Sequence, residues 1–176
     1  MSLENKQDRE AFQWPITQSV AIKAPARKVW DTIASRESLL ESHPYLAANP
    51  IERWGDANSR DEVHYLNGVV YERHFRAWVE GVGFDLEIHR RKKPLAWVSW
   101  RITAIDADNA RLSITVYPFA LQRWPAIIRW VPHWLIMRRY LGAYLRSVVR
   151  GFEWFITKGE RVPRNQFGRH PWFSES

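Results

Sequence analysis

Residues 50–118 hold a series of short runs in which apolar and polar residues alternate, separated by tight turns. The clearest is DEVHYLNGVVYERHF, from Asp61 to Phe75, in which Asn67-Gly68 separates two strand-like halves. Asparagine and glycine tolerate the positive φ angles that a tight hairpin needs. The runs FDLEIHR, LAWVSWRITAI and ARLSITVYP follow, and the last ends at Pro118. Consecutive strands joined by short turns form an antiparallel meander, and such a sheet needs a cover over its apolar face.

Helical patterns at both ends of the chain supply that cover. An alternating strand at 15–23 leads into APARKVWDTIAS, where Pro25 suits a first helical turn and the buried stripe is Val29, Trp30 and Ile33. ESLLESHP predicts a second short helix that stops before Pro44. After Pro118 the apolar spacing becomes three and four, which predicts one long helix ending near Lys158-Gly159. Its stripe is Leu141, Leu145, Val148, Phe152 and Phe155.

These elements predict an α+β domain over residues 15–159. A curved antiparallel sheet of about seven strands wraps on a long C-terminal helix, and two short helices follow the first strand. We expect residues 1–14 to form a leader, about 120–137 a lid-like insertion, and 160–176 an extension that packs on the domain. A long helix across a curved sheet leaves space for an apolar pocket.

Composition narrows the classes of function. The chain has no cysteine, which excludes disulfides, thiolate catalysis and cysteine-ligated zinc. The net charge of +7 favours anionic partners only through long-range attraction. The polar N-terminal residues lack the apolar core of a signal peptide. Arginines interrupt the most apolar stretch of the chain, so that stretch is not expected to span a membrane. We therefore expect a cytoplasmic location, with peripheral membrane contact as the alternative.

Three segments carry a resemblance to a known family. They are SVAIKAPARKVWDTIAS, YLNGVVYERHF and LRSVVRGFEWFITKG, and their order spans most of the chain, from about Pro15 to Gly159. In this order they resemble the START-like, Bet v 1-like helix-grip superfamily (SRPBCC), in particular its polyketide cyclase/dehydrase and lipid-transport branch. The resemblance implies a hydrophobic cavity between the sheet and the long helix. It implies no single reaction, because the superfamily includes carriers, sensors, cyclases and oxygenase domains.

The predicted pocket lies between the sheet and the helix Tyr140–Ile156. Its walls and entrance are expected from Leu141, Leu145, Val148 and Phe152 on the helix, Tyr71, Phe75, Leu86 and Trp100 on the sheet, and Trp30 and Ile33 on the entrance helices. Strand alternation points Arg73, Phe75, Ala77 and Val79 inward and Trp78 outward. Arg73 or Tyr65 would orient a ligand head group. The alternatives are a structural ion pair of Arg73 with Glu87 or Asp31, and ordinary packing of the tyrosines.

Candidates for catalysis are few. His43, with Glu41 as its partner acid, Tyr71 and Glu87 are the residues that could exchange protons inside the pocket. A helix-terminal structural role is the alternative for His43. The six histidines show no metal-ligand spacing, so we expect neither a metal nor a cofactor. His64, His74 and His89 are expected together on the solvent face of the sheet.

The segment RWPAIIRWVPHWLIMRRYLGAYL is rich in tryptophan and arginine and has no acidic residue. One interpretation is a lid or ordinary packing over the cavity, and another is a surface that docks on an anionic membrane. The residues concerned are Trp124, Ile128, Trp130 and Trp134. Nucleic acid is disfavoured as a partner because the arginines alternate with bulky aliphatic residues.

The sequence therefore predicts binding of a hydrophobic or amphipathic small molecule, for transport or sensing. The first alternative is a cyclase/dehydrase-type enzyme acting on an aromatic or polyketide-like substrate, in which positioning supplies much of the catalysis. The second is a membrane-peripheral interaction protein. Convergent polar groups deep in the pocket would favour the enzyme, and a smooth cavity with one polar anchor would favour the carrier.

Overall fold

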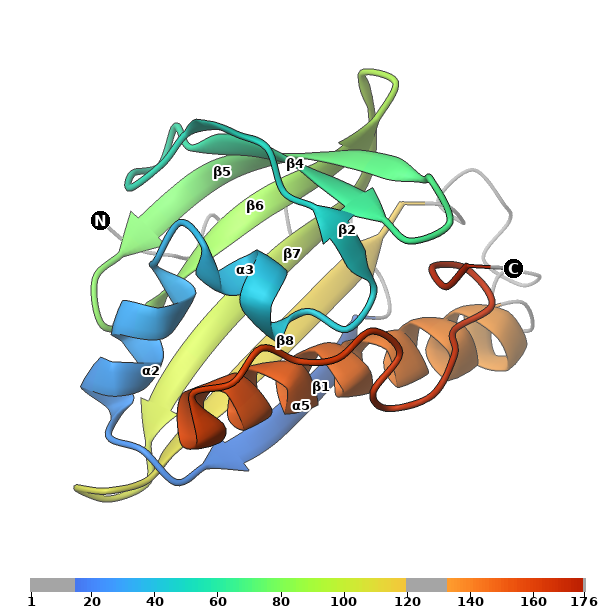
Figure 1. The fold of residues 1–176 in the computed structure, drawn as a ribbon. Helices are drawn as coiled ribbons and strands as arrows, with labels where there is room; N and C mark the ends of the chain where they lie inside the picture. The colour runs from blue at the N-terminus through green and yellow to red at the C-terminus, as the bar shows by residue number, and fades with distance from the viewer. Residues whose placement is uncertain (1–14, 120–132, 176) are drawn as a thin grey trace.

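A computed structural model of the chain describes residues 15–119 and 133–175, with side chains given from 137 onward in the second range. One curved antiparallel sheet carries the long C-terminal helix across one face, and two short helices lie beside it (Figure 1). The strands are β1 (Ile16–Ile22), β2 (Leu46–Ala48), β3 (Ile51–Arg53), β4 (Arg60–Tyr65), β5 (Val70–Val79), β6 (Gly83–Arg90), β7 (Lys93–Ala104) and β8 (Ala110–Pro118). The helices are α2 (Ala26–Ile33), α3 (Ser38–Ser42), the π-helical η1 (His133–Leu141) and α5 (Gly142–Lys158).

The sheet has eight strands in the order β1-β8-β7-β6-β5-β4-β2, and β3 also pairs with β4. The predicted meander from β4 to β8 is confirmed, with every neighbouring pair antiparallel. The first strand lies at one edge of the sheet, where it pairs with the last strand, from Ile16 opposite Val116 to Ile22 opposite Ala110. The strand that sequence reasoning missed is β2, whose three residues are too few to show alternation.

The helix boundaries follow the predicted signals. Pro25 precedes α2, whose buried residues are Val29, Trp30 and Ile33. Gly159 ends α5 in the left-handed conformation, and its amide donates to the Phe155 carbonyl oxygen. The long helix begins earlier than the predicted Tyr140, because η1 runs into α5 without a break. The predicted insertion at 120–137 therefore ends inside η1, and residues 120–132 lie outside the described residues.

Two details of the sheet differ from the sequence prediction: where β7 begins, since its predicted run LAWVSWRITAI starts at Leu95 and the strand starts at Lys93, and which way the end of β5 faces. The β6–β7 turn is formed by Arg91 and Lys92, both with positive φ, so the lysine-proline pair that follows belongs to β7 and not to the turn. A bulge between Phe75 and Ala77 reverses the faces of the end of β5. Trp78 is therefore inside, stacked on Phe84 with ring centroids 5.3 Å apart, and the outward placement of Trp78 was wrong.

The contact of α3 with α5 depends on Gly151. A Cβ atom at this position would lie 2.0 Å from the Ser42 carbonyl oxygen, which is closer than any side chain allows. Glycine thus lets the end of α3 sit directly on α5. The residue after Ser42 is His43, so this approach fixes where the His43 ring enters the interior.

Candidate ligand-binding site

A cavity of about 340 Å³ lies between the sheet and the η1–α5 helix. Its lining is mostly apolar and comes from β4 to β8 on one side and from the helix on the other. This is where the fold was expected to leave space, because a curved sheet and a straight helix diverge away from their contact line. The volume is near the lower end of the range for small-molecule pockets.

Most of the residues predicted to bind ligand line this cavity. They are Tyr65, Tyr71, Arg73, Leu86, Trp100, Leu141, Leu145 and Val148. Trp30, Ile33, Phe75 and Phe152 are buried in the core but do not line the cavity. Phe75 packs among the rings of Trp54, Trp78 and Phe84. Phe152 contacts the edge of Trp100 at 5.1 Å between ring centroids. Face alternation alone cannot separate such packing positions from lining positions, because both point inward.

A chain of hydrogen bonds occupies one end of the cavity. The Tyr45 backbone amide donates to His43 Nδ1 at 3.1 Å, and His43 Nε2 lies 3.0 Å from the Tyr144 hydroxyl. The Tyr144 and Tyr65 hydroxyl oxygens are 2.7 Å apart. Burial, reinforced by the positive charge of Arg73, lowers the pKa of His43 to about 3. Burial also raises the pKa values of Tyr65 and Tyr144, so all three groups are uncharged near neutral pH.

Arg73 reaches the same end of the cavity and is paired with Asp61. Its Nε donates to Asp61 Oδ1 at 2.7 Å, and Nη2 donates to Oδ2. Asn49 adds a hydrogen bond of 3.0 Å to Oδ2. An ion pair of Arg73 was foreseen, but its expected partners, Glu87 and Asp31, were wrong. The register of β4 and β5 places Asp61 directly opposite Arg73.

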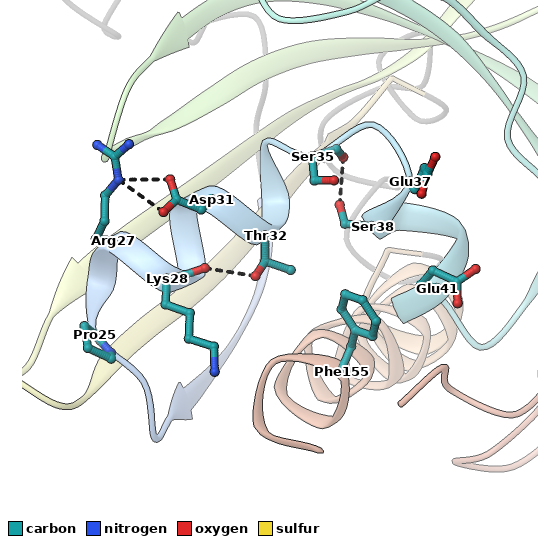
Figure 2. A pocket seen from close by; sticks show the side chains of 10 residues that line it. All are labelled: Pro25, Arg27, Lys28, Asp31, Thr32, Ser35, Glu37, Ser38, Glu41 and Phe155. Carbon is teal, nitrogen blue, oxygen red and sulfur yellow. Dashed lines mark hydrogen bonds and ion pairs between the residues drawn. The ribbon is translucent and has the colours of Figure 1, made fainter. Parts of the chain in front are cut away.

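The predicted acid–base set does not assemble. Glu87 points away from the cavity, where it pairs with Arg76 at 2.8 Å and His89 at 2.9 Å, so its assignment as a catalytic candidate was wrong. Glu41 lines an open groove between α2, α3 and α5 (Figure 2), whereas the hydrogen bonds of the His43 ring go to the Tyr45 amide and the Tyr144 hydroxyl. Tyr71 lines the cavity but is half-buried, with the Arg90 guanidinium 6.0 Å from its ring centre. His43 is the predicted candidate that sits deep inside.

The histidines of the outer sheet face also form contacts there. His74 and His89 stack with centroids 4.3 Å apart, and His64 Nε2 is 2.7 Å from Glu62 Oε2. Within the described residues, no three histidine, cysteine or acidic side chains gather closely enough to hold a metal ion.

The C-terminal segment completes the cavity wall. It runs back beside α5 (Figure 1), and Trp172 and Phe173 both line the cavity. Phe173 stacks on Tyr65 with centroids 4.2 Å apart and contacts Tyr144 at 4.5 Å. The Asn67 side chain donates to the Trp172 carbonyl oxygen at 2.7 Å, and His170 Nε2 donates to the Tyr140 carbonyl oxygen at 2.9 Å.

Tyr144 and Phe173 were absent from the predicted site. Tyr144 lies three residues after Leu141 on the apolar side of the helix, so helical spacing could have indicated it. Phe173 could not be placed, because no local pattern shows where a chain extension lands.

A second hollow, of about 610 Å³, is an open groove between α2, α3 and the end of α5 (Figure 2). Charged and hydroxyl side chains dominate its lining, and Phe155 is its large apolar member. Arg27 and Asp31 pair with each other at 2.9 Å and remain more than half exposed. Side chains that are solvated and already paired offer little to a hydrophobic ligand, so the internal cavity is the better candidate.

The residues predicted to form a lid or a membrane contact fall in and next to the segment 120–132. Trp124, Ile128 and Trp130 lie outside the described residues, and Trp134 falls in the first part of η1, where no side chains are described. None of the described helices combines the length and apolarity needed to cross a bilayer.

Comparisons with known proteins agree with this architecture. No family model and no curated protein sequence matches the chain. Among solved structures, a START superfamily protein from Mycobacterium smegmatis matches with a TM-score of 0.63 and 12% identity, over 82% of this chain and 97% of its own. The Zhui aromatase/cyclase from Streptomyces sp. R1128 matches with a TM-score of 0.57 and 16% identity, over 85% and 99%.

DynU16, from the dynemicin biosynthetic locus, matches with a TM-score of 0.61 and 14% identity over 84% of this chain. The match covers 49% of DynU16, so this chain spans about half the length of that protein. Identities this low establish a shared fold and no more. The chain adopts the START-like, Bet v 1-like helix-grip fold of the SRPBCC type.

Proposed function

We propose that the protein binds a hydrophobic or amphipathic small molecule, such as a lipid, an isoprenoid or a polyketide-like aromatic compound, between its sheet and α5. The observation that most supports this proposal is the apolar cavity of about 340 Å³, whose polar groups lie at one end. A cavity of about 150 Å³ can hold one benzene ring, so this space suits a ligand of about two rings. Fold neighbours that include a START superfamily protein and an aromatase/cyclase support the same class of ligand.

Native mass spectrometry of the purified protein, followed by organic extraction, tests this proposal. We expect a stoichiometric hydrophobic passenger, or uptake of a lipophilic fluorescent probe by protein that carries none. Leu145→Trp should abolish both, because Leu145 is buried and lines the cavity. Ala143→Trp is the matched control, since it adds the same ring to the exposed side of the same helix. Binding that survives Leu145→Trp, or no binding by the unaltered protein, would contradict the proposal.

A cyclase/dehydrase-type activity is the second candidate, because several polar groups converge on one end of the cavity. The Tyr65–Tyr144 pair could donate a hydrogen bond to the oxygen of an enolate as it forms, while the walls fold the substrate chain. His43 is too weak a base at a pKa of about 3 to remove a proton efficiently near neutral pH. Mass-spectrometric analysis of products from a poly-β-ketone thioester tests this candidate. Unchanged product distribution against buffer alone would remove it.

We also propose that an anionic membrane is where the ligand is collected or delivered. Arg138, Arg139 and Arg146 are exposed on the same continuous helix that lines the cavity with Leu141 and Leu145. Exposed arginines attract lipid phosphates. Sedimentation with phosphatidylserine vesicles should exceed that with neutral phosphatidylcholine vesicles and should fall with added salt. Equal recovery with both vesicles would count against a membrane role.

A further inference from the structure

The hydrogen-bonded chain at the polar end of the cavity contains one donor hydrogen more than it can use. The direction of the chain follows from His43. Its Nδ1 accepts the Tyr45 backbone amide at 3.1 Å and so carries no proton. Because the buried ring is neutral, the single ring proton is on Nε2, which therefore donates to the Tyr144 oxygen 3.0 Å away.

Between the two tyrosines, only one hydrogen bond can form. The oxygens are 2.7 Å apart, and one phenol donates while the other accepts. Three hydrogens are thus available, on His43, Tyr144 and Tyr65, and the chain uses two of them. Over the part of the chain that the structure describes, neither hydroxyl has a further partner. Whichever phenol donates, one hydroxyl hydrogen at the cavity surface has no acceptor.

We propose that this unclaimed hydroxyl hydrogen binds an uncharged acceptor oxygen of the ligand, such as a ketone or ester carbonyl, at the Tyr65–Tyr144 end of the cavity. A buried donor without an acceptor is costly, so a ligand that supplies one is preferred over an equally large hydrocarbon. The inference rests on the proposed function, since it names the chemistry of a ligand that the cavity is proposed to hold.

The charge balance favours an uncharged acceptor over a carboxylate. The Arg73 guanidinium is already neutralised by Asp61, whose side chain is fully buried, and His43 carries no charge. The polar end therefore has no net charge. A carboxylate placed there would lose its hydration without gaining an unpaired cation, and that loss costs more than one hydrogen bond returns. Among the described residues that line the cavity, the other cation is Arg90, which is exposed and lies near Tyr71, away from the buried chain.

Three probes of one skeleton test the inference on the unaltered protein: 2-acetylnaphthalene, 2-ethylnaphthalene and 2-naphthoate. They have the two-ring size that the cavity suggests and differ in a carbonyl, a methylene and a carboxylate. Dissociation constants are measured by calorimetry or by competition with a fluorescent probe. We expect the ketone to bind roughly three- to tenfold tighter than the ethyl compound, as one net hydrogen bond implies, and naphthoate to bind weakest.

Two variants test whether the Tyr65 and Tyr144 hydroxyl groups cause the preference for the ketone. In the double variant Tyr65→Phe with Tyr144→Phe, the ketone preference should shrink to within about twofold, and the carbonyl stretching frequency of bound 2-acetylnaphthalene should rise. Tyr71→Phe is the control, because it removes a cavity hydroxyl that takes no part in the chain. The preference should persist in that variant.

The outcomes separate the two proposals. Tight binding of 2-ethylnaphthalene with no ketone preference, or tightest binding of naphthoate, would overturn the inference while leaving a hydrophobic ligand site intact. A ketone preference that survives the double variant would also overturn it. Failure of all three probes to bind would overturn the proposed function, and the inference with it.

Discussion

Asp61→Asn should be among the most damaging single-atom changes in this protein. The Asp61 side chain is 0% exposed and that of Arg73 is 6% exposed, so the ion pair is out of water. Asparagine keeps the shape of Asp61, but its NH₂ group must face either Nε or Nη2 of Arg73, and both of these are donors. The guanidinium then stays buried with no counter-ion. Its neighbours are the rings of Trp54 at 6.0 Å and Phe75 at 5.3 Å, which compensate only weakly.

The expected cost is about 3–5 kcal/mol in the free energy of unfolding, the usual result of removing one partner of a buried pair. With a urea m value of about 2 kcal/mol/M, the unfolding midpoint should fall by roughly 2 M. Circular dichroism during urea titration measures this directly. Glu80→Gln is the matched control, because the Arg27–Glu80 pair has a similar distance of 2.9 Å but side chains that are 69% and 70% exposed. It should cost less than about 1 kcal/mol.

A double variant, Asp61→Leu with Arg73→Met, separates the charge effect from general damage. With both charges removed, no uncompensated ion remains, and stability should recover toward that of the unaltered protein. The reasoning would be refuted if Asp61→Asn cost no more than Glu80→Gln. It would also be refuted if the double variant were less stable than the single one.

Three further predictions concern positions that shape the site. Gly151→Ala should lower the melting temperature, because the alanine Cβ would lie 2.0 Å from the Ser42 carbonyl oxygen. This loss should outweigh the higher helix propensity of alanine. Scanning calorimetry measures the melting temperature, and an unchanged or raised value would disprove the close approach. Phe173→Ala should speed ligand release in stopped-flow displacement, because the Phe173 ring stacks on Tyr65 at the cavity wall with centroids 4.2 Å apart. An unaltered dissociation rate would show that Phe173 does not help to hold the ligand in the cavity. Finally, the pKa of His43 is about 3 in the folded protein against an ordinary 6.5. Below pH 6.5 the unfolded chain therefore binds a proton that the folded protein does not, and this residue should remove about 2 kcal/mol of stability between pH 7 and pH 5. In urea titrations, the free energy of unfolding of His43→Asn should fall by about that much less between pH 7 and pH 5 than that of the unaltered protein. The same pH dependence in both proteins would contradict a lowered pKa of His43.

Much of the fold could be read from local patterns. Alternation along β4 to β8, the Asn67-Gly68 hairpin, Pro25 before α2 and Gly159 after α5 each express a preference that neighbouring residues satisfy among themselves. The inward face of the sheet followed as far as the bulge after Phe75. The Asp61–Arg73 pair could also have been predicted, because both residues lie six positions from Asn67 and face each other across the hairpin.

The polar end of the cavity could not be predicted in the same way. It joins His43 from the end of α3, Tyr65 from β4, Tyr144 from α5 and Phe173 from the C-terminal segment. Periodicity states which face of an element a residue occupies, but not which distant element will lie against that face.

The sequence by itself thus determined the kinds of element, their order and the need for a cover over one sheet face. The tertiary structure decided which inward residues line the cavity and which fill the core, where the β5 bulge turned Trp78 inside, and how far α3 approaches α5 at Gly151. The physical reason is range. Backbone preferences and alternation act between residues close in sequence, whereas the cavity is the space left after segments far apart in the chain have packed against one another.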